Sequence, residues 1–156
     1  MHPRAVEFRE RAAEEYGLAI DVEEFPEGTK TAADAADAVG CEVAQIASSL
    51  VFLADGDPVV VVTSGANRVD EDRVAEALDA GAVEMADAET IRETLGWSIG
   101  GVPPICHESE VPVLFDPTLS GFDTVWAAAG TPKAVFPIDP DRLKRLAGAA
   151  EHEIAV

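Results

Sequence analysis

Two apolar runs joined by a tight turn place the strongest constraint on how this chain folds. Residues 46–54 and 59–63 are largely apolar, and the segment Asp55-Gly-Asp-Pro58 separates them. A short turn-forming segment between two such runs is typical of a β-hairpin. Because the apolar residues follow one another with little alternation, both faces of these strands are expected to be covered. The rest of the chain must therefore supply a layer for each face of a central sheet.

The flanking segments mix helical and strand patterns. Helical spacing and capping residues predict helices over residues 3–16, 31–40, 70–78, 87–95 and 139–146. Apolar runs predict further strands over residues 18–22, 83–86, 111–115, 124–129 and 134–138. This order is neither a regular βαβ alternation nor an all-β pattern. No linker or internal repeat divides the 156 residues, so we predict a single α+β domain over residues 1–156.

The charge of the chain bears on its solvent and its partners. There are 11 Lys and Arg residues against 30 Asp and Glu residues, which gives a formal net charge of −19. In ordinary salt such a protein repels nucleic acid and anionic membranes. The acids, however, are spread along the whole chain, as on proteins from a salt-saturated cytoplasm, where the Debye length is about 3 Å or less. We therefore predict a halophilic protein, for which the charge does not exclude RNA.

The two cysteines, Cys41 and Cys106, lack the spacing of a disulfide framework or a zinc site, so no metal is expected. The charged segment 1–16 does not have the pattern of a signal peptide. No apolar run approaches the roughly 20 residues of a membrane span. We predict a cytoplasmic protein with no membrane contact.

The segment Gly96-Trp-Ser-Ile-Gly-Gly-Val-Pro-Pro-Ile-Cys-His107 is the most unusual part of the sequence. Adjacent glycines followed by adjacent prolines fit neither a regular helix nor a central strand. A loop of this kind can present backbone N–H groups to a carbonyl or a phosphate. The alternative is a tight connection between a helix and a strand. The segment has neither of the two common glycine-rich phosphate-binding patterns.

Five parts of the chain are informative when taken together. They are, in order, Thr31-Ala-Ala-Asp-Ala-Ala36, Gln45-Ile-Ala-Ser-Ser-Leu-Val-Phe52, Val83-Glu-Met-Ala-Asp87, Gly96-Trp-Ser-Ile-Gly-Gly-Val-Pro-Pro104 and Asp116. In this order and spacing they resemble the YbaK/ProX-type aminoacyl-tRNA deacylases, which are relatives of the editing domain of bacterial prolyl-tRNA synthetases. The resemblance covers the chain from about Glu7 to Leu146.

The resemblance implies a strongly curved, mixed β-sheet, partly closed like a barrel and surrounded by helices. It also implies a trans-editing hydrolase that cleaves the ester between a wrong amino acid and the 3′-terminal ribose of tRNA. The implied chemistry uses water or substrate hydroxyls, without a covalent enzyme intermediate, a metal or a cofactor. The implied partners are the aminoacyl 3′ end of tRNA and an aminoacyl-tRNA synthetase.

By the same resemblance, Gly100 and Gly101 lie beside the scissile ester and act as catalytic residues. The deacylases usually carry a lysine where this chain has Ser48, which cannot supply a charge. Ser48 is interpreted either as a substituted catalytic residue or as a plain strand residue, and Lys30 is a candidate to reach the same pocket. The expected substrate-binding residues are Thr31, Ser49, Ser64, Gly65, Pro104, His107 and Asp116.

Four of these residues have alternative interpretations. Asp116 precedes Pro117 and fits a turn-initiating residue, Ser64-Gly65 fits a turn between a strand and a helix, and His107 fits a surface histidine. If the interpretation as a site is right, Ser48, Gly101 and Asp116 should line one cleft.

Two other functions remain open. Because the charged lysine is missing, the chain is also interpreted as a non-catalytic binder of aminoacyl-tRNA ends or nucleotides. An unrelated hydrolase using Ser48 or Ser49 is a weaker hypothesis, since the sequence has no GxSxG motif and no histidine matched to either serine.

Overall fold

The computed structural model describes residues 1–25 and 31–155. The helices are α1 (Pro3–Tyr16), α2 (Ala32–Val39), α3 (Glu71–Leu78), α4 (Ala88–Leu95) and α5 (Pro140–Ala147), with short 3-10 helices η1 (Val43–Gln45) and η2 (Pro117–Gly121). The strands are β1 (Glu23–Glu24), β2 (Ile46–Ala54), β3 (Asp57–Ser64), β4 (Val83–Met85), β5 (Val113–Phe115), β6 (Val125–Ala128), β7 (Ala134–Ile138) and β8 (Ala150–Glu151). None of these helices is long and apolar enough to cross a membrane.

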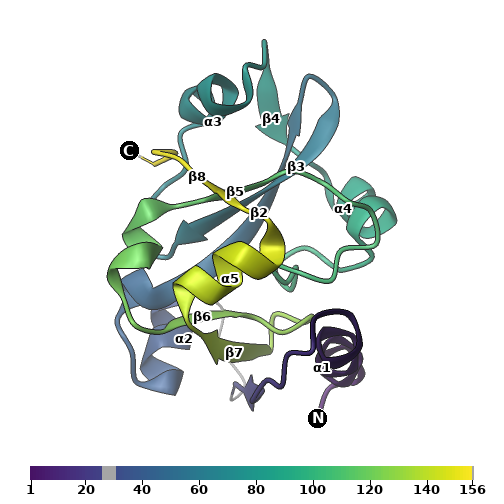
Figure 1. The fold of residues 1–156 in the computed structure, drawn as a ribbon, viewed down its shortest axis with the longest axis vertical. Coiled ribbons are helices and arrows are strands. Elements are labelled where there is room, and N and C mark those ends of the chain that lie inside the picture. The colour runs from purple at the N-terminus through teal and green to yellow at the C-terminus, as the bar shows by residue number, and fades with distance from the viewer. Residues whose placement is uncertain (26–30, 156) are drawn as a thin grey trace.

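The strands form one mixed sheet in the order β1-β7-β6-β2-β3-β5-β8, with β4 added to β2 (Figure 1). The β2–β6, β3–β5 and β5–β8 pairs are parallel, and the other pairs are antiparallel. The predicted α+β class with a mixed sheet is therefore confirmed. The path of the described strands ends at β1 and β8, which do not pair with each other, so the predicted partial closure into a barrel is not confirmed.

The predicted hairpin is present as β2 and β3. Its antiparallel register runs from Ala47 opposite Ser64 to Ala54 opposite Asp57, which leaves a two-residue turn at Asp55 and Gly56. Both turn residues have positive φ, as tight hairpin turns of this length require. β2 is the strand on which β3, β4 and β6 converge.

The core confirms that both faces of the hairpin are covered. Residues 59–62 of β3 are four consecutive buried valines. One alternate pair packs in the cluster that contains Phe8 of α1 and Leu143 of α5, and the other pair packs in the cluster that contains Val74 of α3. Helices therefore cover both sides of the sheet, as the unbroken apolar run predicts.

The prediction of a strand over residues 18–22 is wrong. Leu18 is buried, and Ile20 and Val22 pack against the core, so the alternation of side chains is real. The backbone there pairs with no described strand, and the N–H of Leu18 donates to the Ala12 carbonyl at the end of α1. Strand pairing begins only at β1. The short strand β8, at the far edge of the sheet, was not predicted.

Candidate functional site

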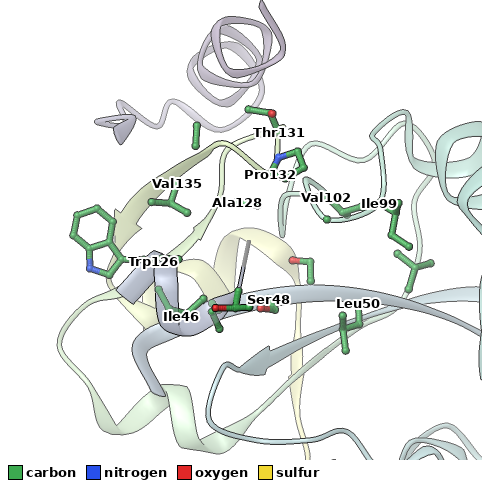
Figure 2. A pocket seen from close by; sticks show the side chains of 18 of the residues that line it. Ile46, Ser48, Leu50, Ile99, Val102, Trp126, Ala128, Thr131, Pro132 and Val135 are labelled. Atoms are coloured by element: carbon green, nitrogen blue, oxygen red, sulfur yellow. The ribbon is translucent and has the colours of Figure 1, made fainter. Parts of the chain in front are cut away.

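A cavity of about 520 Å³ lies against β2. Its walls come from β2, α2, the loop that contains Ile99 and Gly100, and the segments of β6 and β7 on either side of their connecting turn. Figure 2 shows Ile46, Ser48 and Leu50 along β2, with Val102 and Ile99 across from them. The cavity thus joins the two segments that the sequence analysis singled out, the β2 segment and the glycine loop.

The cavity runs along the edge of β2 and not across one face. Six consecutive residues, Ile46–Val51, line it, whereas one face of a strand would supply only every second residue. β6 pairs with β2 at Ile46 and Ala47, and β4 pairs with β2 at residues 52–54. Between these two pairings, β2 has no strand partner among the described residues on the side away from β3. We call this stretch, residues 48–51, the β2 gap.

The glycine loop lines the cavity with Gly100, whereas the neighbouring Gly101 does not line it. A Cβ atom on Gly101 would come within 2.6 Å of the Thr131 Cα atom, so only glycine allows the loop to approach this closely. The Gly101 N–H donates to the Ser98 carbonyl at 3.0 Å. Gly101 therefore holds the loop against the β6–β7 turn, and its N–H is already occupied.

Trp97 fixes the start of the same loop. Its ring is fully buried, and its Nε1–H donates to the Cys106 carbonyl at 2.9 Å. The Arg4 guanidinium of α1 lies 4.1 Å from the centre of the ring, a distance typical of a cation–π contact. These contacts at the two ends of the loop hold the glycines in place.

Of the ten residues predicted for the site, the structure brings four to the cavity: Thr31, Ser48, Ser49 and Gly100. The other six do not line it; they are Ser64, Gly65, Gly101, Pro104, His107 and Asp116. Ser48 and Asp116 therefore do not share the cavity wall, although Thr63, which is opposite Ser48 in β3, donates to Asp116.

Asp116 is a buried carboxylate whose hydrogen bonds are filled from within the chain. It accepts from the Asn67 side chain at 2.8 Å, the Thr118 N–H at 2.9 Å, the Ser64 N–H at 3.0 Å and the Thr63 hydroxyl at 3.1 Å. Burial alone raises the pKa of a carboxyl group, but these hydrogen bonds outweigh burial and hold the pKa of Asp116 below its ordinary value. Asp116 is thus ionised and joins the end of β3 to η2.

Ser64 and Gly65 have a packing role in the turn after β3. The Ser64 hydroxyl donates to the Ala44 carbonyl at 2.7 Å. A Cβ atom on Gly65 would come within 2.7 Å of the Val43 carbonyl oxygen, so the turn lies directly against η1. This geometry agrees with the alternative that the sequence analysis left open for these residues.

The segment after the glycine loop turns its polar groups toward the protein interior. His107 Nε2 lies 2.7 Å from the Pro103 carbonyl, to which it can donate. Burial lowers the pKa of His107, so its ring is neutral at pH 7, and burial raises the pKa of Cys106 to about 12. Neither side chain lines the cavity, so neither is placed to activate Ser48 or Ser49.

The described side chains that line the cavity carry no formal charge. Their hydroxyl groups come from Thr31, Ser48, Ser49 and Thr131, and the Thr31 hydroxyl is occupied as the cap of α2. The Ser49 hydroxyl is buried and has no hydrogen-bond partner among the described residues. Lys30, a predicted source of charge, lies outside the described residues. No group of three or more His, Cys, Asp or Glu side chains in the described part of the chain is arranged to hold a metal ion.

Met85 and Ile99 line the cavity and were not predicted. They are 59% and 55% exposed, and Met1 is the one other large apolar side chain that is exposed in residues 1–25 and 31–155. Exposed apolar side chains gathered at a cavity are typical of a binding surface. Ile99 could have been found from the sequence. A large apolar residue in a glycine–proline loop does not belong to the buried face of a helix or strand, so it is a candidate for an exposed binding surface.

The comparisons with known proteins identify the family. Residues 26–146 match the model of the aminoacyl-tRNA editing domain. The protein YwhH of Bacillus subtilis is 32% identical over 126 residues, which cover 79% of this chain and 78% of YwhH. The proline–tRNA ligase of Lysinibacillus sphaericus is 38% identical over 73 residues, 47% of this chain but only 13% of the ligase.

The fold comparison agrees with the sequence match. The crystal structure of a candidate trans-editing enzyme for prolyl-tRNA synthetase superposes on the chain with a TM-score of 0.94 and 38% identity. The superposition covers 100% of this chain and 99% of that structure. The chain belongs to the aminoacyl-tRNA editing domain family.

Proposed function

We propose that this chain is a trans-editing hydrolase that removes a wrong amino acid from the 3′-terminal ribose of tRNA. The observation that carries the proposal is the cavity between the β2 segment and the glycine loop, in a chain of the editing-domain family. Its volume of about 520 Å³ falls in the ordinary range of small-ligand sites. An aminoacyl group and part of the terminal adenosine are ligands of that size.

The exposed side chains at the cavity suit the nucleoside part of this substrate. Met85 and Ile99 offer an apolar surface for the terminal adenine, and the indole of Trp126 lies on another wall (Figure 2). A chain with a net charge of −19 has little basic surface for the body of a tRNA. Recognition therefore concentrates on the 3′ end, and a synthetase partner supplies contacts to the rest of the tRNA.

The proposed reaction is addition of water to the ester carbonyl carbon. The bond from that carbon to the ribose oxygen then breaks, the ribose hydroxyl is restored with a proton, and the free amino acid leaves. No charged side chain among the described lining residues is available as a base, so a neighbouring ribose hydroxyl orients the water by a hydrogen bond, and the proton that the water loses passes to the departing ribose oxygen. An activated ester of this kind needs orientation and hydrogen-bond donors more than it needs a strong nucleophile.

The experiment is a deacylation assay with the purified chain in 2 M KCl and a panel of mischarged tRNAs. Transfer RNA for proline comes first, because proline–tRNA ligases are among the relatives. We expect hydrolysis of at least one mischarged tRNA well above the rate in buffer, with correctly charged tRNA spared. Hydrolysis no faster than in buffer across the whole panel would remove the enzymatic proposal.

The second candidate function is a non-catalytic binder of aminoacyl-tRNA ends. It is favoured by one observation: the family lysine is replaced by Ser48, and the described lining carries no charge. A binder predicts saturable association with an aminoacyl-adenosine analogue and no turnover, with activity gained in Ser48→Lys. Turnover by the unmodified chain would exclude it.

We also propose that the chain works in the salt-rich cytoplasm of a halophile. Its 30 acidic residues repel one another in dilute salt, and molar KCl screens that repulsion. The melting temperature should therefore rise steeply between 0.1 and 3 M KCl, with unfolding at the low end. Circular dichroism melts at matched pH would measure this, and a melting temperature independent of KCl would contradict it.

A further inference from the structure

We infer that the peptide group of Ser49, in the β2 gap, recognises the aminoacyl group by pairing with it as with one residue of an added β-strand. This inference rests on the proposed function and names the part of the cavity that reads the α-amino ester.

Those directions alternate along β2. In a hairpin with a two-residue turn, the pair that closes the turn is hydrogen bonded, and every second pair beyond it is hydrogen bonded too. Ala54 opposite Asp57 closes this turn, so even-numbered residues of β2 bond to β3. The bond from the Gly65 N–H to the Ile46 carbonyl, 2.8 Å long, follows this rule.

Odd-numbered residues of β2 therefore point their N–H and C=O groups away from β3. Two contacts outside the hairpin agree: the Ala86 N–H donates to the Val51 carbonyl at 3.0 Å, and the Asp55 N–H donates to the Ala82 carbonyl at 2.8 Å. Ser49 lies between the end of the β6 pairing and the start of the β4 pairing. Its N–H and C=O are thus directed into the gap that the cavity occupies.

A single α-amino acyl group has the shape to fill this gap. The nitrogen and the carbonyl oxygen of one residue point to the same side of an extended strand, and two facing residues exchange two hydrogen bonds. The Ser49 N–H can donate to the ester carbonyl, and the Ser49 carbonyl can accept from the α-ammonium. The aminoacyl group would thus pair with β2 in the way that one residue of an added β-strand does.

The charge of the cavity supports the same pairing. A buried ammonium needs hydrogen-bond acceptors, and no described lining side chain is an anion. A backbone carbonyl at the cavity edge supplies an acceptor without a carboxylate. The Ser49 hydroxyl is buried without a partner, which has a cost in stability, and a small shift of this side chain would bring a third polar group to the ligand.

The experiment follows the Ser49 amide directly. The ¹⁵N-labelled chain in 2 M KCl is titrated with 3′-(L-alanylamino)-3′-deoxyadenosine, an amide that resists hydrolysis, and with its matched analogue lacking the α-amino group. We expect the Ser49 amide resonance to shift on saturation and its hydrogen exchange to slow. Loss of the α-amino group should weaken binding by about tenfold, the scale of one charge-assisted hydrogen bond.

Two serine variants separate the hydroxyl from the fold. Ser49→Ala should weaken binding by about threefold to tenfold, the scale of one hydrogen bond. Ser120→Ala is the matched control, because Ser120 carries the other buried, unpartnered hydroxyl found in the described residues and does not line the cavity. Ser120→Ala should bind as the unmodified chain does.

The outcomes distinguish the two proposals. Binding that leaves the Ser49 amide and its exchange unchanged, or equal binding of the analogue without the α-amino group, overturns the pairing and leaves the editing function standing. Absence of saturable binding, together with absence of hydrolysis in the deacylation assay, overturns both.

Discussion

Asp116 and Ser49 are both polar residues at the central sheet, but they differ in how far their hydrogen bonds are filled from within the chain. Four internal donors surround the Asp116 carboxylate. The Ser49 hydroxyl has no partner among the described residues, and its peptide group points into a cavity. The family resemblance placed both residues among the expected substrate-binding residues.

The difference shows which kind of polar group is free to take a ligand. A carboxylate that already accepts four hydrogen bonds has little capacity to accept another from a ligand. Its removal leaves the surrounding donors without an acceptor. A peptide group with no strand partner at the edge of a cavity is available without rearrangement of the sheet. On this criterion we expect the ligand to bind at the β2 gap, whereas the Asp116 carboxylate joins the end of β3 to η2.

The largest expected effect tests the structural side of this comparison. Asp116→Ala leaves the Ser64 and Thr118 N–H groups and one N–H of the Asn67 amide without their acceptor, and should lower the free energy of unfolding by on the order of 3 kcal/mol. Urea denaturation in 2 M KCl measures the change. Asp21→Ala, at an exposed aspartate, is the control and should change little. A stable Asp116→Ala chain that had lost hydrolysis would reverse the comparison.

The next effect concerns the cavity side. Gly101→Ala forces the glycine loop away from Thr131 and should slow deacylation by about 10- to 100-fold through misplacement of the loop. Gly121→Ala is the control, because a Cβ atom there meets no atom within 4 Å. Equal rates for the two variants would show that the loop position does not matter for the reaction.

A smaller effect appears in the pH dependence of stability. Because the folded chain holds the pKa of Asp116 below its ordinary value, the ionised carboxylate contributes stability above the ordinary pKa. That contribution is lost as the pH falls from the ordinary pKa through the folded one. The difference in unfolding free energy between the unmodified chain and Asp116→Asn should be constant near neutral pH and shrink below about pH 4. A difference that does not change with pH would contradict the assigned ionisation.

The last prediction concerns Cys106, where we expect treatment with a thiol reagent to have no effect. Cys106 is buried, and its pKa is raised to about 12, so almost no thiolate is present at pH 7. Iodoacetamide at pH 7 should leave Cys106 unmodified by mass spectrometry and leave deacylation unchanged. Modification of Cys106 with parallel loss of activity would bring a third region into the site.

The central hairpin was predictable from sequence because its signal is local. A two-residue turn and an unbroken apolar run determine the register and the burial of both faces within about twenty residues. The strand predicted over residues 18–22 failed for the opposite reason. Alternation of apolar and polar residues indicates which side chains are buried. A strand also needs a pairing strand, which lies far away in the sequence.

The site was predictable as two segments but not as a set of side chains. The β2 segment and the glycine loop meet at the cavity, as the family resemblance implied. The exclusion of Asp116 and Ser64 depends on hydrogen bonds to residues about 20 to 50 positions away, which no local pattern reports. The β2 gap depends on where two other strands stop pairing with β2, and that too is a property of the whole sheet.

The divided pairing of β2 has a mechanical consequence. β6 and β4 pair with opposite halves of one strand, so β3 is the one described strand that holds β2 in the stretch between them. A molecule bound along this stretch would bridge β6 and β4, and the stiffness of one would then depend on that of the other. Occupancy of the cavity would then stiffen the β4 pairing as far as Ala54, which does not itself line the cavity.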